Sequence, residues 1–287
     1  MDNHQKALAL FRKGAALFAI CAACFSATSC DDSQKQEERA REIYAQAEEA
    51  FHNGDDELAY RLIDSIKTSC PKAFETRQKG LDLKNRIVIT SAQEQIALAD
   101  SMRLALEEQG QKLRQGLKLV KDAQYEEEGN YIAPSQLDEA NRSRSYLRAQ
   151  VSEGGNLVLT SVARSGRAVQ HNGICVRLGD KEVRSARGEA FTQGAGRKVD
   201  YTETQGARDI AAFIAQNEGE NLKLDFLTSS GAVAVPLTAA DRKAIAAVYR
   251  CYENLAEIEK LKKETEEAYV KIRFYEKKSQ ERRPPHS

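Results

Sequence analysis

Arginine and lysine side chains recur through residues 164–198, in the most basic part of the chain. Residues 142–208 hold 12 basic and 6 acidic residues, whereas residues 31–141 hold 15 and 23. Guanidinium groups such as those of Arg177 and Arg187 can bind carboxylates and phosphates bidentately. This region is therefore either an anion-binding surface, for an acidic glycan, a lipid headgroup or an acidic protein, or a solvated strand face. The candidate residues are Arg164, Arg167, Arg177, Lys181, Arg184, Arg187, Arg197 and Lys198.

Catalytic motifs are missing from the sequence, which has no GxSxG, HExxH, P-loop or EF-hand pattern. His171 and Cys175 would lie about 13 Å apart on a strand, so we expect a turn histidine and a buried thiol. The acidic residues of the same region show no pairing of the glycosidase kind. We therefore expect no catalytic residue, metal or cofactor. The alternative is an enzyme that acts on envelope glycans or peptides through Asp180, Glu182 and His171.

The elements that must position these residues form a small α+β head over residues 152–237. Apolar and β-branched runs predict strands, and Ser229-Ser230-Gly231 predicts a hairpin turn. Ser165-Gly166 is a further turn, and residues 209–216 predict a short helix. The predicted strands cover residues 156–162, 173–178, 182–190, 221–227 and 232–237.

Two shorter helices are predicted over residues 34–53 and 56–69, with Gly54 in the turn between them and Pro71 after them. Ala47 and Ala59 fall where the helices must approach closely. Residues 34–71 thus resemble one tetratricopeptide repeat (TPR), or form a plain helical hairpin. Because a lone repeat cannot bury both faces, its other face must pack on the next helix or on a partner.

Long helices are predicted on both sides of the head. Residues 72–151 form a stalk, with one helix to about residue 128 and a short helix over 136–151. A return helix follows over 238–280, with Thr238 and Asp241 as a capping-box variant. We expect an α+β, mostly helical fold in which a coiled-coil-like antiparallel stalk carries the head. The same apolar seams could close a homodimer, and residues 281–287 are expected to be a disordered tail.

The N-terminus reads as an export signal over residues 1–29. Lys6, Arg12 and Lys13 precede an apolar run that is shorter than the roughly 20 residues of a membrane span. Residues 26–30 resemble the lipobox of bacterial lipoproteins, with Ala27 where leucine is usual and Cys24 as a competing site. This resemblance implies that Cys30 is acylated and that residues 30–33 begin a tether, because acyl chains hold a protein at a membrane.

Asp31 and Asp32 resemble the surface-export signal of Bacteroidota lipoproteins, and the whole layout is similar to lipoproteins of the Bacteroidales type. The resemblance implies a location at the cell envelope, on the outer membrane, either facing the periplasm or exposed at the surface. It implies no activity.

The remaining cysteines, Cys70, Cys175 and Cys251, are odd in number and lack CxxC spacing, so they predict buried thiols. Cys70 and Cys251 are expected to be too far apart for a disulfide. Nucleic acid is not an expected partner, because aromatic residues do not interleave the basic ones.

Three functions remain open: a non-catalytic binding or scaffold protein, an envelope enzyme, and a structural subunit that docks through residues 40–71. An acidic glycan or another protein is the expected partner, beside the membrane itself.

Overall fold

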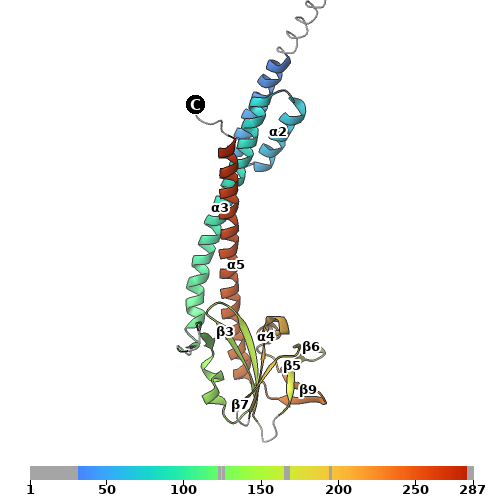
Figure 1. Cartoon of the computed structure of the whole chain (residues 1–287). Coiled ribbons are helices and arrows are strands. Elements are labelled where there is room, and N and C mark those ends of the chain that lie inside the picture. Colours follow the sequence, from blue (N-terminus) through green and yellow to red (C-terminus); the bar gives the residue numbers. More distant parts are fainter. Residues whose placement is uncertain (1–31, 122–123, 125–126, 165–168, 194–195, 283–287) are drawn as a thin grey trace, which may run out of the picture. The chain divides into compact units, whose positions relative to one another are not determined.

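The computed structural model describes residues 32–282, except for 122–123, 125–126, 165–168 and 194–195 (Figure 1). The chain divides into two compact units. Unit 1 contains residues up to 96 and from 266 onward, and unit 2 contains residues 97–265. Helices and antiparallel sheets are both present, which confirms the α+β class. No helix in the described part of the chain is long and apolar enough to span a bilayer.

Unit 1 begins with the predicted helical hairpin. Residues 32–52 are helical, and α2 follows over Asp56–Ser69. Gly54 turns the chain with φ +78°, a conformation that favours glycine. The Asp55 carboxylate accepts a hydrogen bond from the Leu58 amide and so caps α2. Ala47 and Ala59 are fully buried, as expected for small residues where two helices approach closely.

Helix α3, over Phe74–Arg114, covers the other face of the hairpin within unit 1. Its residues Leu83 and Ile87 share a hydrophobic cluster with Ile63 of α2. A side chain at Gly80 would lie 2.9 Å from Ile63 Cγ2, so glycine permits the close approach. The second face of the TPR-like hairpin is thus packed against the next helix.

Helix α5, over Ala239–Glu281, runs antiparallel to α3 inside each unit. In unit 1, Ala92 and Ile96 pack against Ala268 and Ile272. The Asn85 side-chain amide donates to Ser279 Oγ at 2.9 Å. In unit 2, the Asn254 amide donates to the Leu106 carbonyl at 2.9 Å. The predicted antiparallel pairing of the two long helices is therefore confirmed within each unit.

The prediction of a stalk over residues 72–151 is wrong beyond Arg114. After α3, β1 (Lys118–Val120) pairs with β2 (Asn130–Ile132), and two 3₁₀ helices follow, η1 (Pro134–Gln136) and η2 (Asp138–Asn141). Gly116 destabilises a continued helix by about 1 kcal/mol relative to alanine. The backbone groups of residues 118–120 find their hydrogen-bond partners in β2 instead. The expected α-helix over 136–151 is not formed: η2 lies in its first half, and its last six residues belong to β3 (Tyr146–Ser152), whose residues alternate between two faces.

Unit 2 contains two antiparallel sheets that share one core with helix α4 (Ala207–Gln216) and the first part of α5. The six-stranded sheet has the order β1-β2-β3-β4-β8-β7, with β4 at Leu157–Arg164, β8 at Gly196–Tyr201 and β7 at Glu189–Gln193. The four-stranded sheet has the order β10-β9-β5-β6. Its strands are β5 (His171–Leu178), β6 (Lys181–Arg184), β9 (Lys223–Thr228) and β10 (Gly231–Val235).

Most predicted elements of the head are confirmed: β4, β5, α4 and the β9–β10 hairpin. The strand expected over 182–190 is instead two strands, β6 and β7, that belong to different sheets. Strand β8 was not predicted. The head also begins earlier than residue 152, because β1, β2 and β3 belong to its six-stranded sheet.

Gly188 explains where the 182–190 segment changes sheet. A Cβ atom at this position would lie 2.5 Å from the Asp200 carbonyl oxygen, 2.6 Å from Val199 Cγ1 and 2.7 Å from Tyr201 Cδ1. The chain therefore approaches β8 so closely, just before it pairs with β8 as β7, that only glycine fits.

Replacing Gly188 with alanine should lower the free energy of unfolding of unit 2 by about 1–3 kcal/mol, because the backbone of β8 cannot move aside cheaply. Gly219→Ala is the matched control, since no atom lies within 4 Å of the Cβ that it would add. Its effect should stay within about 0.5 kcal/mol. Urea denaturation followed by circular dichroism compares the two, and equal midpoints would contradict the argument.

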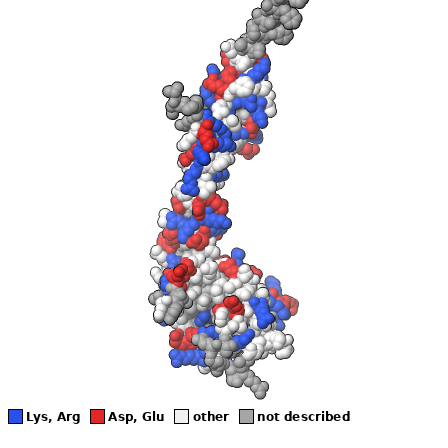
Figure 2. Space-filling model, viewed as in Figure 1, with Lys and Arg blue, Asp and Glu red and all other residues white. Residues whose placement is uncertain are grey.

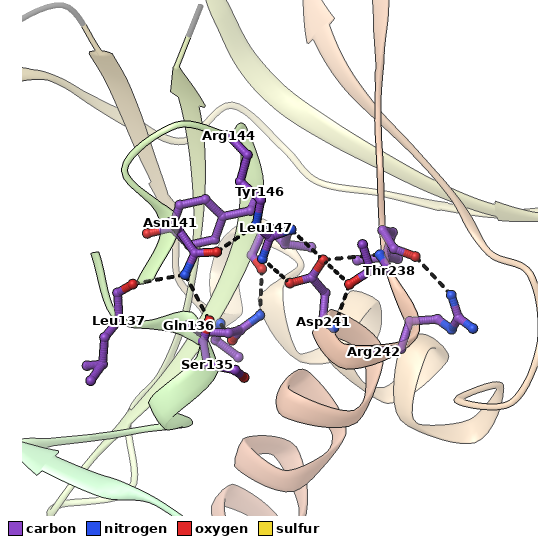
Figure 3. Close-up of polar contacts among 12 residues, drawn as sticks. Ser135, Gln136, Leu137, Asn141, Arg144, Tyr146, Leu147, Thr238, Asp241 and Arg242 are labelled. Carbon is purple, nitrogen blue, oxygen red and sulfur yellow. Dashed lines mark hydrogen bonds and ion pairs between the residues drawn. The ribbon is translucent and has the colours of Figure 1, made fainter. Parts of the chain in front are cut away.

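The start of α5 is tied to the segment that precedes β3 (Figure 3). Thr238 and Asp241 form the predicted capping box, with hydrogen bonds between 2.7 and 3.1 Å. Arg144 adds two hydrogen bonds to the Asp241 carboxylate, at 2.8 and 2.6 Å. Arg144 also donates to Asn141 Oδ1 at 2.6 Å. In the same segment, the Gln136 side chain pairs with the backbone of Leu147 and Ala149.

The three cysteines in the described part of the chain are free thiols, and all three are buried. Cys251 belongs to the core of unit 2. Cys70 lies in a separate cluster with Ala40, Ile66 and Ala73. Cys30 and the whole export signal lie outside the described residues, as do Arg167, the Ser165-Gly166 turn and most of the predicted tail.

Candidate anion-binding site

The predicted basic residues do not form one continuous surface. Figure 2 shows cationic side chains in separate groups on unit 2, several of them beside carboxylates. On the four-stranded sheet, Arg177 pairs with Asp225, and Arg184 pairs with Glu182 at 2.9 Å. The thiol of Cys175 lies 3.7 Å from the same Glu182 carboxylate. Each arginine on this sheet therefore already has a carboxylate partner.

Three other candidates are also dispersed. The Arg197 guanidinium donates to the His171 carbonyl at 2.7 Å and to Gln170 Oε1 at 3.1 Å, so it supports the start of β5. Lys181 is exposed on the edge strand β6, and Arg187 is exposed in the connection between β6 and β7. Of these three, only Lys181 lies on the four-stranded sheet, and Arg197 is already held by uncharged acceptors.

Arg164 and Lys198 do come together, on the six-stranded sheet, and Arg148 joins them. All three surround the carboxylate of Asp138 in η2. The distance from Lys198 Nζ to Asp138 Oδ2 is 2.6 Å. The guanidinium groups of Arg148 and Arg164 lie farther from Oδ1, at 3.5 and 3.9 Å. The Tyr146 hydroxyl donates to the same Oδ1 at 2.6 Å.

Strand register explains this meeting. Tyr146 of β3 is paired with Val162 of β4, and Val162 is paired with Lys198 of β8. Alternation then puts Arg148, Thr160 and Arg164 on the same face of the sheet. Residues on the opposite face, such as Leu147, Ala149 and Leu159, belong to the hydrophobic core. The cations consequently lie on the outer face, over which η2 places Asp138.

The Asp138 carboxylate does not accept hydrogen bonds from all the donors around it. Three buried polar atoms of this face have no hydrogen-bond partner within the described structure: Arg148 Nε, Arg164 Nε and Thr160 Oγ1. Thr160 is itself only 1% exposed. Asp200 of β8 lies on this face too, directly paired with Thr160 of β4. Within the described residues, however, no ion pair joins Asp200 to the three cations. Unsatisfied buried donors are costly, and this face holds more hydrogen-bond donors than Asp138 accepts.

The electrostatics of Asp138 reflect the same crowding. Burial by itself would raise the pKa of this carboxyl. Hydrogen bonds from Lys198 and Tyr146, with the charges of Lys198 and Arg148, outweigh burial and hold the pKa below its ordinary value. The site therefore keeps a resident carboxylate at neutral pH, and an incoming anion must share the cations with it.

The site is accessible and has an aromatic neighbour. The side chains of Arg148, Lys198, Arg164 and Asp138 are 15%, 19%, 28% and 37% exposed. Phe191 of the edge strand β7 is directly paired with Lys198 and is 50% exposed. An anion that reaches the cations could therefore carry an apolar face that packs on the Phe191 ring.

Arg148 and Asp138 were not among the predicted site residues. The signal that could have revealed Arg148 is the alternation of β3, in which Leu147, Ala149 and Val151 are apolar and Arg148 and Gln150 are polar. The helical interpretation of residues 136–151 concealed this period of two. Nothing local in the sequence marks Asp138, because η2 meets β8 only through the fold.

His171 is not the turn histidine that the sequence predicted. It is fully buried at the start of β5, where its ring stacks on Phe226 with 4.4 Å between centroids. Its Nε2 lies 2.7 Å from Ser161 Oγ, which is 3.1 Å from the Tyr201 hydroxyl. Ser161 and Tyr201 are also fully buried. No substrate could reach this hydrogen-bonded chain without opening the core.

The enzymatic alternative thus has no accessible histidine beside Asp180 and Glu182. Among the residues that the structure describes, no cluster of three or more His, Cys, Asp and Glu side chains could hold a metal ion. The group around Asp138 is the strongest candidate site. The comparisons with known proteins returned no match, whether to a family model, a curated protein or a solved structure.

Proposed function

We propose that this chain is a non-catalytic envelope lipoprotein, anchored through acylated Cys30, whose unit 2 binds an acidic glycan at the Asp138 site. One observation carries the proposal. Arg148 and Arg164 point two guanidinium groups at a single carboxylate, yet the Nε atom of each is buried without a hydrogen-bond partner. An additional anion would share with Asp138 the exposed parts of these two guanidinium groups, whose side chains are 15% and 28% exposed.

The chemistry of the site favours a carboxylate on a sugar ring. Guanidinium groups bind carboxylates through parallel hydrogen bonds, and Lys198 adds a point charge. Phe191 offers a half-exposed ring next to Lys198. The C–H face of a uronic acid packs on such a ring while its carboxylate reaches the cations.

Membrane attachment would restrict this binding to the membrane surface. Several acyl chains on Cys30 would hold the protein firmly at a membrane surface, because each buried CH₂ contributes about 0.8 kcal/mol. Acidic glycans are extended polymers, and a tethered protein can bind them only where they pass near that membrane. The chain would then act as a scaffold between the membrane and the glycan.

Titration calorimetry of the mature chain tests the proposal with uronate oligosaccharides and their methyl esters. The acids should bind, and the esters, which lack the charge, should bind more weakly by tenfold or more, about 1.4 kcal/mol. Arg148→Gln and Arg164→Gln should each weaken binding of the acid by a similar factor, because a hydrogen bond to a charged group contributes about 1.5–3 kcal/mol.

Arg187→Gln is the matched control, because Arg187 is an exposed arginine outside the site. Its affinity for the acids should equal that of the unchanged chain. Equal binding of acids and esters, or full affinity in both arginine variants, would refute the Asp138 site. Phe191→Ser adds a separate readout, since it should weaken binding of oligosaccharides and leave binding of free acetate unchanged.

A further inference from the structure

Unit 1 has a groove between α2 and α3 that the proposed glycan site does not use. Its volume is about 350 Å³. Helix α2 contributes Ile63, Asp64 and Lys67, and α3 contributes Phe74, Arg77, Gln78, Leu81 and Lys84. All these residues lie in unit 1. The groove is therefore a feature of this unit alone.

Three residues of the lining are large and apolar. Ile63 is buried, and the close approach at Gly80 holds α2 near α3. Phe74 is 74% exposed and Leu81 is 43% exposed. These two residues are seven positions apart, so they lie on one side of α3 two turns from each other. A helix that leaves two large apolar side chains in line beside a groove presents a surface that another helix could cover.

The charged lining residues are mostly basic. Lys84 is paired with Asp64 at 2.6 Å. Arg77 donates to the Pro71 carbonyl at 2.8 Å and lies 5.9 Å from the centre of the Phe74 ring. Lys67 and Arg77 have no carboxylate partner among the residues described, which leaves a surplus of two positive charges. Complementarity of charge thus selects an acidic occupant.

We infer that the α2–α3 groove docks an acidic amphipathic helix of another protein. Leucine-like side chains seven residues apart would cover Phe74 and Leu81, and glutamate or aspartate residues on either side would meet Lys67 and Arg77. This interaction is independent of the glycan site, because the two sites lie in different units and share no residue. It would make the lipoprotein an adaptor that holds a partner protein at the membrane.

The probe is a fluorescein-labelled helical peptide of about 15 residues with leucines seven positions apart and glutamates beside them. Its fluorescence anisotropy is measured with the mature chain. The acidic peptide should bind, while versions with alanine for leucine or lysine for glutamate should bind at least about tenfold more weakly. Equal binding of the acidic and basic peptides would overturn the inference.

Protein variants locate the binding. Phe74→Ser and Arg77→Glu should each reduce peptide affinity by about tenfold or more. Leu104→Ser and Lys271→Glu are the matched controls: Leu104 is an exposed leucine of α3 outside the groove, and Lys271 is an exposed lysine of α5. Neither should change the affinity. Because Phe74 is mostly exposed, its variant should keep the circular dichroism spectrum of the folded chain.

Sedimentation velocity tests whether the groove is instead occupied by a second copy of this chain. A monomer at all concentrations supports docking of a different protein. A dimer that dissociates in the Phe74→Ser variant would show that the groove is a self-association surface and would overturn the inference.

Discussion

Replacing Asp241 with alanine should lower the free energy of unfolding of unit 2 by about 2–4 kcal/mol, from the lost charged hydrogen bonds and the lost helix cap. The Asp241 side chain is only 2% exposed, and two hydrogen bonds join it to Arg144 (Figure 3). Alanine would remove the carboxylate from Arg144, whose side chain is 36% exposed and still donates to Asn141 Oδ1 at 2.6 Å. The same change removes the hydrogen bonds with Thr238 that cap α5, which by itself costs about 1 kcal/mol.

Urea denaturation followed by circular dichroism measures this loss, and hydrogen exchange assigns it to β3 and the first turns of α5. Glu218→Ala is the matched control, because Glu218 pairs with Arg250 at 2.7 Å where the arginine is 51% exposed. Surface pairs contribute about 0–1 kcal/mol, so this variant should change little. A loss below about 1 kcal/mol for Asp241→Ala would show that the buried pair is not what holds α5 to this segment.

Unit 2 should lose stability as the pH falls below about 6.5, because of His171. Burial lowers the pKa of His171, and the charge of Arg197 acts in the same direction against the hydrogen bonds with Val169 and Ser161. The unfolded chain therefore binds a proton near pH 6.5, where the folded chain does not. The stability that depends on neutral His171 is complete above this pH. It is lost progressively as the pH falls toward the lowered pKa of the folded state.

The free energy of unfolding, measured in urea at pH 5, 6 and 7, tests this expectation. Each tenfold weakening of proton binding on folding corresponds to about 1.4 kcal/mol of stability. His171→Phe keeps a ring against Phe226 and removes the titrating group. We expect this variant to be less stable at pH 7 but nearly independent of pH over the same range. A pH dependence equal to that of the unchanged chain would place the effect elsewhere.

The helical parts of the fold could be predicted because their signals are local. Gly54 and Pro71 punctuate the hairpin, and Ala47 and Ala59 mark where its helices touch. Thr238 and Asp241, which are three positions apart, form the capping box that marks the start of α5. The turn before Gly231 defines the β9–β10 hairpin in the same way. In each case the residues that determine the element lie within a few positions of one another.

The wrong secondary-structure predictions concern segments whose backbone hydrogen-bond partners lie far along the chain. Leu147, Ala149 and Val151 suit a strand, but Leu137, Ala140 and Leu147 also fit a helical spacing, and only pairing with β4 decides between the two. The 182–190 segment looked continuous because its residues all favour strands. Gly188 divides it, since β8 passes within contact distance there. Neither partner strand is visible in the local sequence.

The candidate site, too, was predictable only in part: its basic character follows from composition, and its arrangement depends on the fold. Composition alone singled out a basic region and named Arg164 and Lys198 within it. Strand register put these two residues beside Arg148, and η2 brought Asp138 to all three. Those of the other named cations that the structure describes contact carboxylates, a carbonyl or solvent instead.

The amino-acid sequence by itself determined the secondary structure of the hairpin and of α5 and the surplus of positive charge in the head, because these depend on neighbouring residues and on composition. Only the tertiary structure decided which cations meet, which are neutralised and which buried donors stay unpaired. Electrostatic and hydrogen-bonding energies depend on distances of a few ångströms between side chains that are 10 to 60 positions apart in the chain. Such distances are set by the register of strands.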